Sequence, residues 1–87
     1  MLICEVTGHV WATKKENTLS GMKLMVVREL AQDDKETNHT FVAADIVGAG
    51  IGERVLVVNG STARKAFGDR EPAVDATIVG IIDSVQM

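Results

Sequence analysis

The sequence predicts an all-β fold: a small five-stranded barrel with one short helix between the fourth and fifth strands. Three observations favour this class. Five segments are apolar in a strand-like pattern, glycine and polar clusters separate them, and no strand–helix–strand rhythm recurs along the chain. Strands without that rhythm are expected to pair antiparallel, and closing them into a barrel leaves few open edges.

Length and composition predict one folded domain, covering residues 1–87. Hydrophobic residues make up 46% of the sequence, but aromatic residues only 3%, so aliphatic side chains must fill the core. The single cysteine, Cys4, excludes an internal disulfide and is typical of a reducing compartment. No basic signal-peptide region opens the chain, and no apolar run approaches the roughly 20 residues of a membrane span. These features predict a cytoplasmic protein with no membrane partner.

The first three strands are expected in the N-terminal half of the chain. Residues 1–11 alternate polar and apolar side chains, and this period of two indicates a half-buried strand. The polar residues 13–21 are predicted to form a loop. The second strand is expected over 23–30 and the third over 40–46, and the charged residues between them read as an exposed hairpin loop.

The fourth and fifth strands are expected over 54–58 and 75–83, where β-branched residues dominate. Both segments are apolar on both faces, whereas a barrel strand needs only an apolar inner face. One short helix cannot cover the remaining apolar surface, and such surface marks a subunit interface. We therefore expect a homo-oligomer, most simply a closed ring. The candidate interface or barrel-strand residues are Val55, Val57, Val79 and Ile81.

The segment between these two strands is predicted to contain the single helix. Asn59-Gly60 is a strong turn signal, and Ser61 is expected to cap a helix over 61–67 that Gly68 ends. Residues 69–73 contain the only proline and predict an irregular connector.

Three alternating glycines, Gly48, Gly50 and Gly52, form the most informative motif of the chain. A dinucleotide-binding fingerprint would follow a strand and open a helix, but here a β-branched strand follows, and no Gly-Lys-Ser/Thr supplies a P-loop. The residues alone favour a tight interstrand loop with an exposed ion pair between Glu53 and Arg64. The alternative is a close approach by another chain, which glycine permits.

Other chemistries find little support in the sequence. The potential metal ligands Cys4, His9 and His39 are dispersed, and both histidines are expected to be solvated. Ser61 has no local signature of a nucleophile, and the paired carboxylates Asp33 and Asp34 lie in a charged loop. We therefore expect no catalytic residue, no metal and no cofactor.

A five-stranded barrel of this size resembles the OB-fold, which often binds single-stranded nucleic acid through a basic groove and aromatic platforms. The chain instead has a net charge of −3, and its aromatic residues are Trp11, Phe41 and Phe67. Nucleic acid is therefore not expected as a partner. A small oligomeric OB-like module that binds a ligand or single-stranded nucleic acid remains the alternative function.

Four separated motifs, in order, cover nearly the whole chain. They are Val6-x-Gly8-x-Val10-Trp11-Ala12-Thr13-x-Lys15 with Leu19-x-Gly21-x-Lys23-Leu24, then Val42-Ala-x-Asp45-x-Val47-Gly48-Ala-Gly-x-Gly52-Glu53-x-Val55-Leu-Val, then Gly60-Ser61-x-Ala63-Arg64, and finally Val74-Asp75-Ala76-x-Ile78-Val79-Gly80-Ile81-x-Asp83. In these motifs the chain resembles the EutN/CcmL family of bacterial microcompartment vertex proteins.

The resemblance implies an OB-like barrel that assembles into a homopentamer. Such pentamers close the corners of a polyhedral protein shell whose flat facets are built of hexamers from another family. It implies a structural, non-enzymatic role in a cytoplasmic microcompartment shell. It also implies that two short segments meet the facet hexamers, with these candidate shell-contact residues: Gly48, Ala49, Gly50, Gly52, Glu53, Ser61, Ala63 and Arg64.

Overall fold

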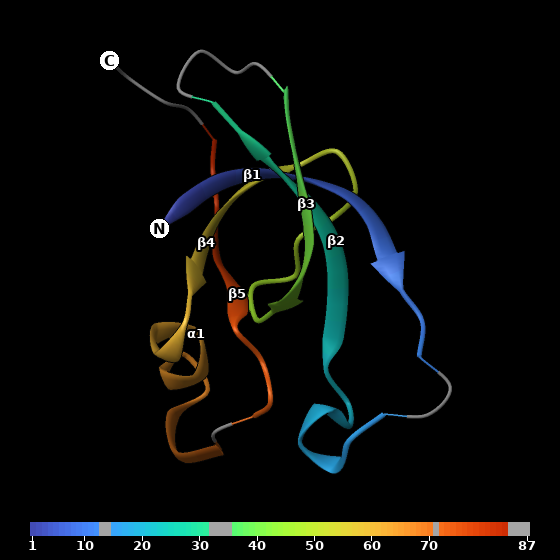
Figure 1. The fold of residues 1–87 in the computed structure, drawn as a ribbon, viewed down its shortest axis with the longest axis vertical. Coiled ribbons are helices and arrows are strands. Elements are labelled where there is room, and N and C mark those ends of the chain that lie inside the picture. The colour runs from blue at the N-terminus through green and yellow to red at the C-terminus, as the bar shows by residue number, and fades with distance from the viewer. Residues whose placement is uncertain (13–14, 32–35, 71, 84–87) are drawn as a thin grey trace.

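The computed structural model describes residues 1–12, 15–31, 36–70 and 72–83. Five strands and three short helical segments follow one another along the chain (Figure 1). Their bounds are β1 Leu2–Val10, η1 Asn17–Leu19, β2 Lys23–Leu30, β3 Glu36–Asp45, β4 Arg54–Asn59, α1 Ser61–Lys65, η2 Gly68–Arg70 and β5 Ala76–Ile81. The predicted all-β class, with one short α-helix between the fourth and fifth strands, is confirmed.

The five strands close into a barrel in the order β1-β2-β3-β5-β4. Four of the neighbouring pairs are antiparallel, but β3 and β5 pair in parallel through Ala44 with Thr77 and Asp45 with Ile78. The expectation of an antiparallel sheet throughout is therefore wrong at this pair. The long connection through β4 and α1 brings β5 back beside β3 in the same direction, and two register pairs suffice to close the barrel.

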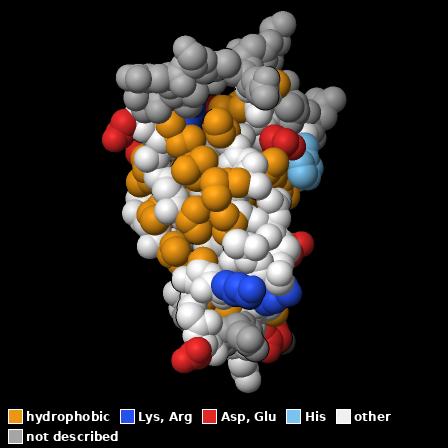
Figure 2. Space-filling view, turned by 90° about the vertical axis from the view of Figure 1, so that its left-hand side faces the viewer, with side chains coloured by type: hydrophobic (Ala, Val, Ile, Leu, Met, Phe, Trp, Pro, Cys, Tyr) orange, Lys and Arg blue, Asp and Glu red, His pale blue; other side chains and the backbone are white. Residues whose placement is uncertain are grey.

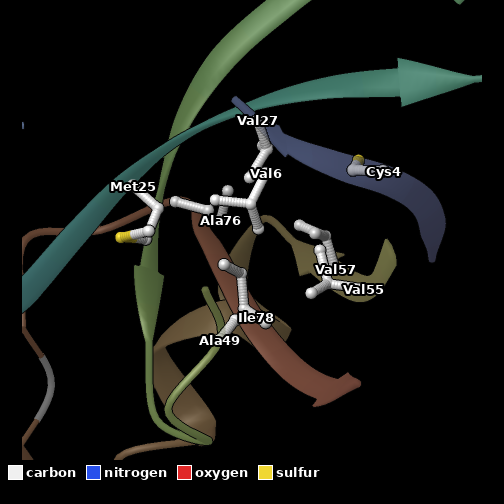
Figure 3. Packing of buried hydrophobic residues seen from close by; sticks show 10 residues of the cluster. Cys4, Val6, Met25, Val27, Ala49, Val55, Val57, Ala76 and Ile78 are labelled. Atoms are coloured by element: carbon white, nitrogen blue, oxygen red, sulfur yellow. The ribbon is translucent and has the colours of Figure 1, made fainter. Parts of the chain in front are cut away.

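The barrel interior is filled by small and medium aliphatic side chains. Figure 3 shows them pointing toward one another from β1, β2, β4 and β5, with Ala49 entering from the loop before β4. The buried core cluster comprises Cys4, Val6, Met25, Val27, Ala43, Ala49, Val55, Val57, Ala76 and Ile78. Cys4 and Val6, two positions apart on β1, both point inward, in agreement with the period of two that the sequence predicted.

The third strand begins earlier than the sequence indicated. It starts at Glu36 rather than at residue 40, because β2 and β3 continue to pair up to Leu30 with Glu36 across an irregular register. Part of the predicted hairpin loop is therefore strand, and residues 32–35 of that loop lie outside the described residues. The predicted bounds of β2 are confirmed, and those of β1, β4 and β5 lie within two residues of the predictions.

The helix is also shorter than expected, since it ends at Lys65 and a 3₁₀ turn follows at Gly68–Arg70. The predicted capping role of Ser61 is wrong. Gly60 occupies the N-cap position with φ +66°, no side chain caps the helix, and Ser61 is its first residue. Residues other than glycine rarely adopt a backbone with that φ. The turn therefore requires glycine at the position before the helix.

Local packing explains why β4 is apolar on both faces. Val55 and Val57 point into the core, while Val58 pairs with Thr77 on the outer face. Helix α1 covers that part of the outer face, because Thr77 Oγ1 donates to the carbonyl oxygen of Ala63 at 2.8 Å. The helix therefore covers the outer face at one end of β4, and the outer face at the other end stays uncovered.

Candidate functional site

The loop between β3 and β4, residues 46–53, is held by a single carboxylate at its start; we call it the glycine loop. Asp45 is the last residue of β3, and its side chain is fully buried. Its Oδ1 accepts the backbone N–H groups of Val47 at 2.9 Å and Gly48 at 3.1 Å, and its Oδ2 accepts that of Ala49 at 2.7 Å. Lys23 Nζ completes the cluster, 3.3 Å from Asp45 Oδ2 and 2.7 Å from the Ala49 carbonyl oxygen.

The far end of the glycine loop is held against β1. The backbone N–H of Gly52 donates to the carbonyl oxygen of Val6 at 2.8 Å, and the N–H of Val6 donates to that of Glu53 at 2.9 Å. The Glu53 carboxylate turns back onto its own loop, where it accepts the N–H of Gly50 at 2.6 Å. Within one chain, then, Glu53 binds the loop rather than Arg64.

Two of the three glycines are required by their backbone angles. Gly48 has φ +79° and Gly52 has φ +92°, conformations in which other residues are strained. Gly50 has an ordinary φ, but a Cβ atom there would lie 3.3 Å from Glu53 Oε1. The glycines thus produce a tight, internally bonded loop.

The predicted contact residues of this loop differ in their exposure. Gly48, Gly52 and Glu53 are exposed, Gly50 is half-buried, and the Ala49 side chain is fully buried in the core. The sequence reading missed Ile51, which is 59% exposed between two glycines. No sequence signal identifies it, because Ala49 also lies between two glycines of the same loop and is fully buried.

The second predicted contact segment lies on α1. Ser61 and Arg64 are exposed, whereas the Ala63 side chain is fully buried against the barrel. Arg64 Nη1 donates to the carbonyl oxygen of Val74 over a long 3.4 Å. The six residues of β4 separate this helix from the glycine loop, about 20 Å at strand rise. Among the described residues, no hydrogen bond or ion pair joins the two predicted segments within one chain.

The outer surface of the barrel carries apolar side chains on the side of β4 and β5. Figure 2 shows hydrophobic groups gathered over the middle of this face, with basic side chains below them. Of the four predicted interface residues, Val55 and Val57 are buried in the core, Val79 is half-buried and Ile81 is 37% exposed. Val79 has no pairing partner in the β4–β5 ladder because the register shifts between Leu56 and Val57.

A second apolar region lies on the outside of β2 and β3. A shallow cavity of about 200 Å³ runs between these strands and the segment before β5. Val42, which lines it, is 44% exposed, and the backbone N–H of the lining residue Ala73 donates to Thr18 Oγ1. The cavity is lined by Leu19, Leu24, Val42, Ala44, Ala73, Val74, Asp75 and Ala76.

The remaining polar groups are dispersed over the barrel. His39 Nδ1 lies 2.9 Å from Glu29 Oε2, and His9 stacks on Trp11 at a ring-centroid distance of 5.7 Å; both histidines are exposed. Burial, with the nearby Glu29 charge, raises the pKa of the Cys4 thiol to about 11, so it stays protonated and unreactive at neutral pH.

Two further findings apply only to the described ranges. There, no three His, Cys, Asp or Glu side chains are grouped so that they could hold a metal ion. Among the helices that the structure describes, none has the length and apolar character needed to cross a bilayer.

Comparison with known proteins gives matches along almost the whole chain. A protein-family model described as ethanolamine utilisation protein EutN/carboxysome matches residues 1–83. The carboxysome shell vertex protein CcmL of Thermosynechococcus vestitus is 45% identical over 98% of this chain and 86% of its own. The bacterial microcompartment shell vertex protein PduN of Salmonella typhimurium is 42% identical over 98% of each chain.

A solved structure shows the same fold in an assembly. The GrpN pentameric microcompartment shell protein from Rhodospirillum rubrum superposes with a TM-score of 0.89 at 41% identity. The match covers 100% of this chain and 98% of GrpN.

Proposed function

The chain belongs to the EutN/CcmL family, and from this premise we propose that it forms pentameric vertices of a bacterial microcompartment shell. The observation that carries the proposal is the match, over 98% of the chain, to proteins named shell vertex proteins, one of whose relatives is a pentamer of the same fold. These matches favour the vertex function over the binding module considered from the sequence. The protein acts through assembly rather than catalysis, since its relatives are named for a place in a shell.

The partners proposed for this vertex are copies of itself and hexameric facet proteins. A flat layer of six-fold units cannot close, and five-fold units at the corners supply the missing curvature. Each chain must therefore provide two kinds of contact, one to its neighbours in the ring and another to the surrounding facets.

The ring contact is assigned to two apolar surfaces that the single chain leaves exposed. A closed ring of five copies needs a head-to-tail interface, in which two different surfaces of the chain meet. The surface that exposes Ile81 at the end of β5 and the shallow cavity beside Val42 on β3 are such a pair. Both expose aliphatic side chains, and interfaces between permanent subunits are more apolar than those of transient complexes.

The facet contact is assigned to the glycine loop and α1. Gly48, Gly52 and Glu53 offer exposed backbone and a carboxylate at one end of β4, and Arg64 offers a guanidinium at the other. Each subunit then presents two separate contact elements rather than one. Arg64 suits this role because it can donate to carbonyl or carboxylate oxygens of a neighbour with little loss inside its own chain.

Replacing Arg64 with alanine is expected to leave the ring intact and to lower incorporation into shells roughly tenfold, the effect of losing one charge-assisted contact. The measurement is the ratio of this chain to facet protein in shells purified after co-expression. Lys65→Ala is the matched control, because Lys65 is the neighbouring exposed basic residue of the same helix. Dissociation of the isolated ring by Arg64→Ala would instead place Arg64 in the subunit interface.

The proposed function itself is tested by co-expressing the unchanged chain with hexameric facet proteins of one microcompartment. We expect the chain in purified shells at a low, fixed ratio to facet protein, and we expect open sheets or tubes when it is omitted. Two results together would contradict the proposal. Closed shells would form equally well without the chain, and shells from cells that co-express the chain would not contain it.

A further inference from the structure

We propose that Asp45 and Lys23 are positioning residues that hold the glycine loop in the shape that docks to its neighbour in the shell. The inference rests on the proposed function, and it names the two side chains that order the loop before it docks. Neither residue needs to touch the partner, because the Asp45 side chain is fully buried and Lys23 Nζ is engaged with Asp45 and Ala49.

The Asp45 carboxylate fixes three successive peptide groups of the loop. Its two oxygens accept the N–H groups of Val47, Gly48 and Ala49 at 2.7–3.1 Å. Hydrogen bonds to a charged acceptor are the stronger kind, and removing the acceptor leaves the donors unpaired. The carboxylate therefore decides the direction in which the chain leaves β3.

Lys23 fixes the same loop from the neighbouring strand. It is the first residue of β2, and it lies opposite Asp45 in the β2–β3 register. Because Asp45 holds the N–H of Ala49 and Lys23 holds its carbonyl oxygen, both backbone polar groups of Ala49 are fixed. The Ala49 side chain is in the core, so this residue anchors the loop and the exposed Gly48 and Ile51 extend on either side of it.

The need for such an anchor follows from the composition of the loop. Glycine loses more conformational freedom on ordering than any other residue, and this loop has glycine at 48, 50 and 52. A loop that is already ordered in the free ring does not lose that freedom again when it docks. The Asp45–Lys23 pair thus favours assembly without making a contact of its own.

Asp45→Asn and Lys23→Met test this inference in the full chain. Asparagine keeps the size of the side chain but loses one acceptor oxygen and the negative charge. We expect amide hydrogen exchange at residues 47–49 to become roughly tenfold faster in Asp45→Asn, with a smaller increase in Lys23→Met. Exchange at Val27 and Val57 in the core should not change. Ring mass should stay the same, and incorporation into co-expressed shells should fall several-fold in both variants.

Two further variants sharpen the test. Lys23→Arg keeps a cation in place and should recover most of the incorporation lost in Lys23→Met. Glu29→Gln is the matched control, since Glu29 pairs with His39 at the opposite end of the same two strands and should leave the loop and the assembly unchanged.

The inference is overturned if loop exchange is unchanged in both variants, or if it rises while incorporation stays at the level of the unchanged chain. Rings that fall apart in both variants would also overturn it, because the loop would then belong to the subunit interface. These outcomes differ from a failure of the proposed function, in which the unchanged chain itself does not enter shells.

Discussion

Replacing Ile81 with aspartate is expected to break the ring into single chains while the barrel stays folded. Ile81 is the last residue of β5, lies opposite Val55 in the β4–β5 register and is 37% exposed in the single chain, so the barrel tolerates a polar side chain there. In a ring the same position would bury an unpaired carboxylate in every interface, at a cost of several kcal/mol each. Native mass spectrometry reads the assembly state, and circular dichroism of the dispersed chain checks the fold.

The matched control is the same substitution at Ile51, which is more exposed and lies on the glycine loop. Ile51→Asp should leave the ring intact, because that loop is assigned to the facet contact. A ring that survives Ile81→Asp would remove β5 from the subunit interface. If only Ile51→Asp breaks the ring, the glycine loop belongs to the subunit interface and the surface around Ile81 to the facet contact.

Truncating Ile78 to alanine is expected to lower the free energy of unfolding by about 2–5 kcal/mol, the range for a large aliphatic residue in a packed core. Ile78 is fully buried, and it also belongs to the short parallel pair that closes the barrel. A domain of this size has only about 5–15 kcal/mol of stability in total, so the loss is a large share.

Chemical unfolding of both chains at one protein concentration measures the difference, because assembly itself adds stability. Ile81→Ala is the control and should cost less per single chain, since its side chain is already partly exposed. A loss below about 1 kcal/mol for Ile78→Ala would show that the barrel does not depend on this closure.

The strands could be predicted from the sequence because their side chains carry the information locally. Alternation over Leu2–Val10 and the β-branched run Arg54–Asn59 reflect which face is buried, and each can be recognised within a few residues. The parallel pairing of β3 with β5 could not, because it depends on where a 30-residue connection returns in space. The early start of β3 at Glu36 has the same cause, since the charged segment is ordered by pairing with β2.

The candidate site was predictable only in outline. Glycine spacing located the tight loop, but the burial of Ala49 and Ala63 depends on the barrel surface beneath them, and small residues look alike whether exposed or buried. The exposure of Ile51 was missed because hydrophobicity alone places an isoleucine in the core. The Asp45–Lys23 pair joins residues 22 positions apart, so it becomes visible only once β2 and β3 are in register.

Native mass spectrometry of the unchanged chain at low micromolar concentration counts the copies in the assembly. For a pentameric vertex we expect one dominant species of about 46 kDa, five times the 9.3 kDa mass of the chain. A hexamer would still be a ring, but a six-fold ring does not match a five-fold corner. A dominant monomer of 9.3 kDa would contradict the assignment of the two exposed apolar surfaces to a subunit interface, and with it the vertex function.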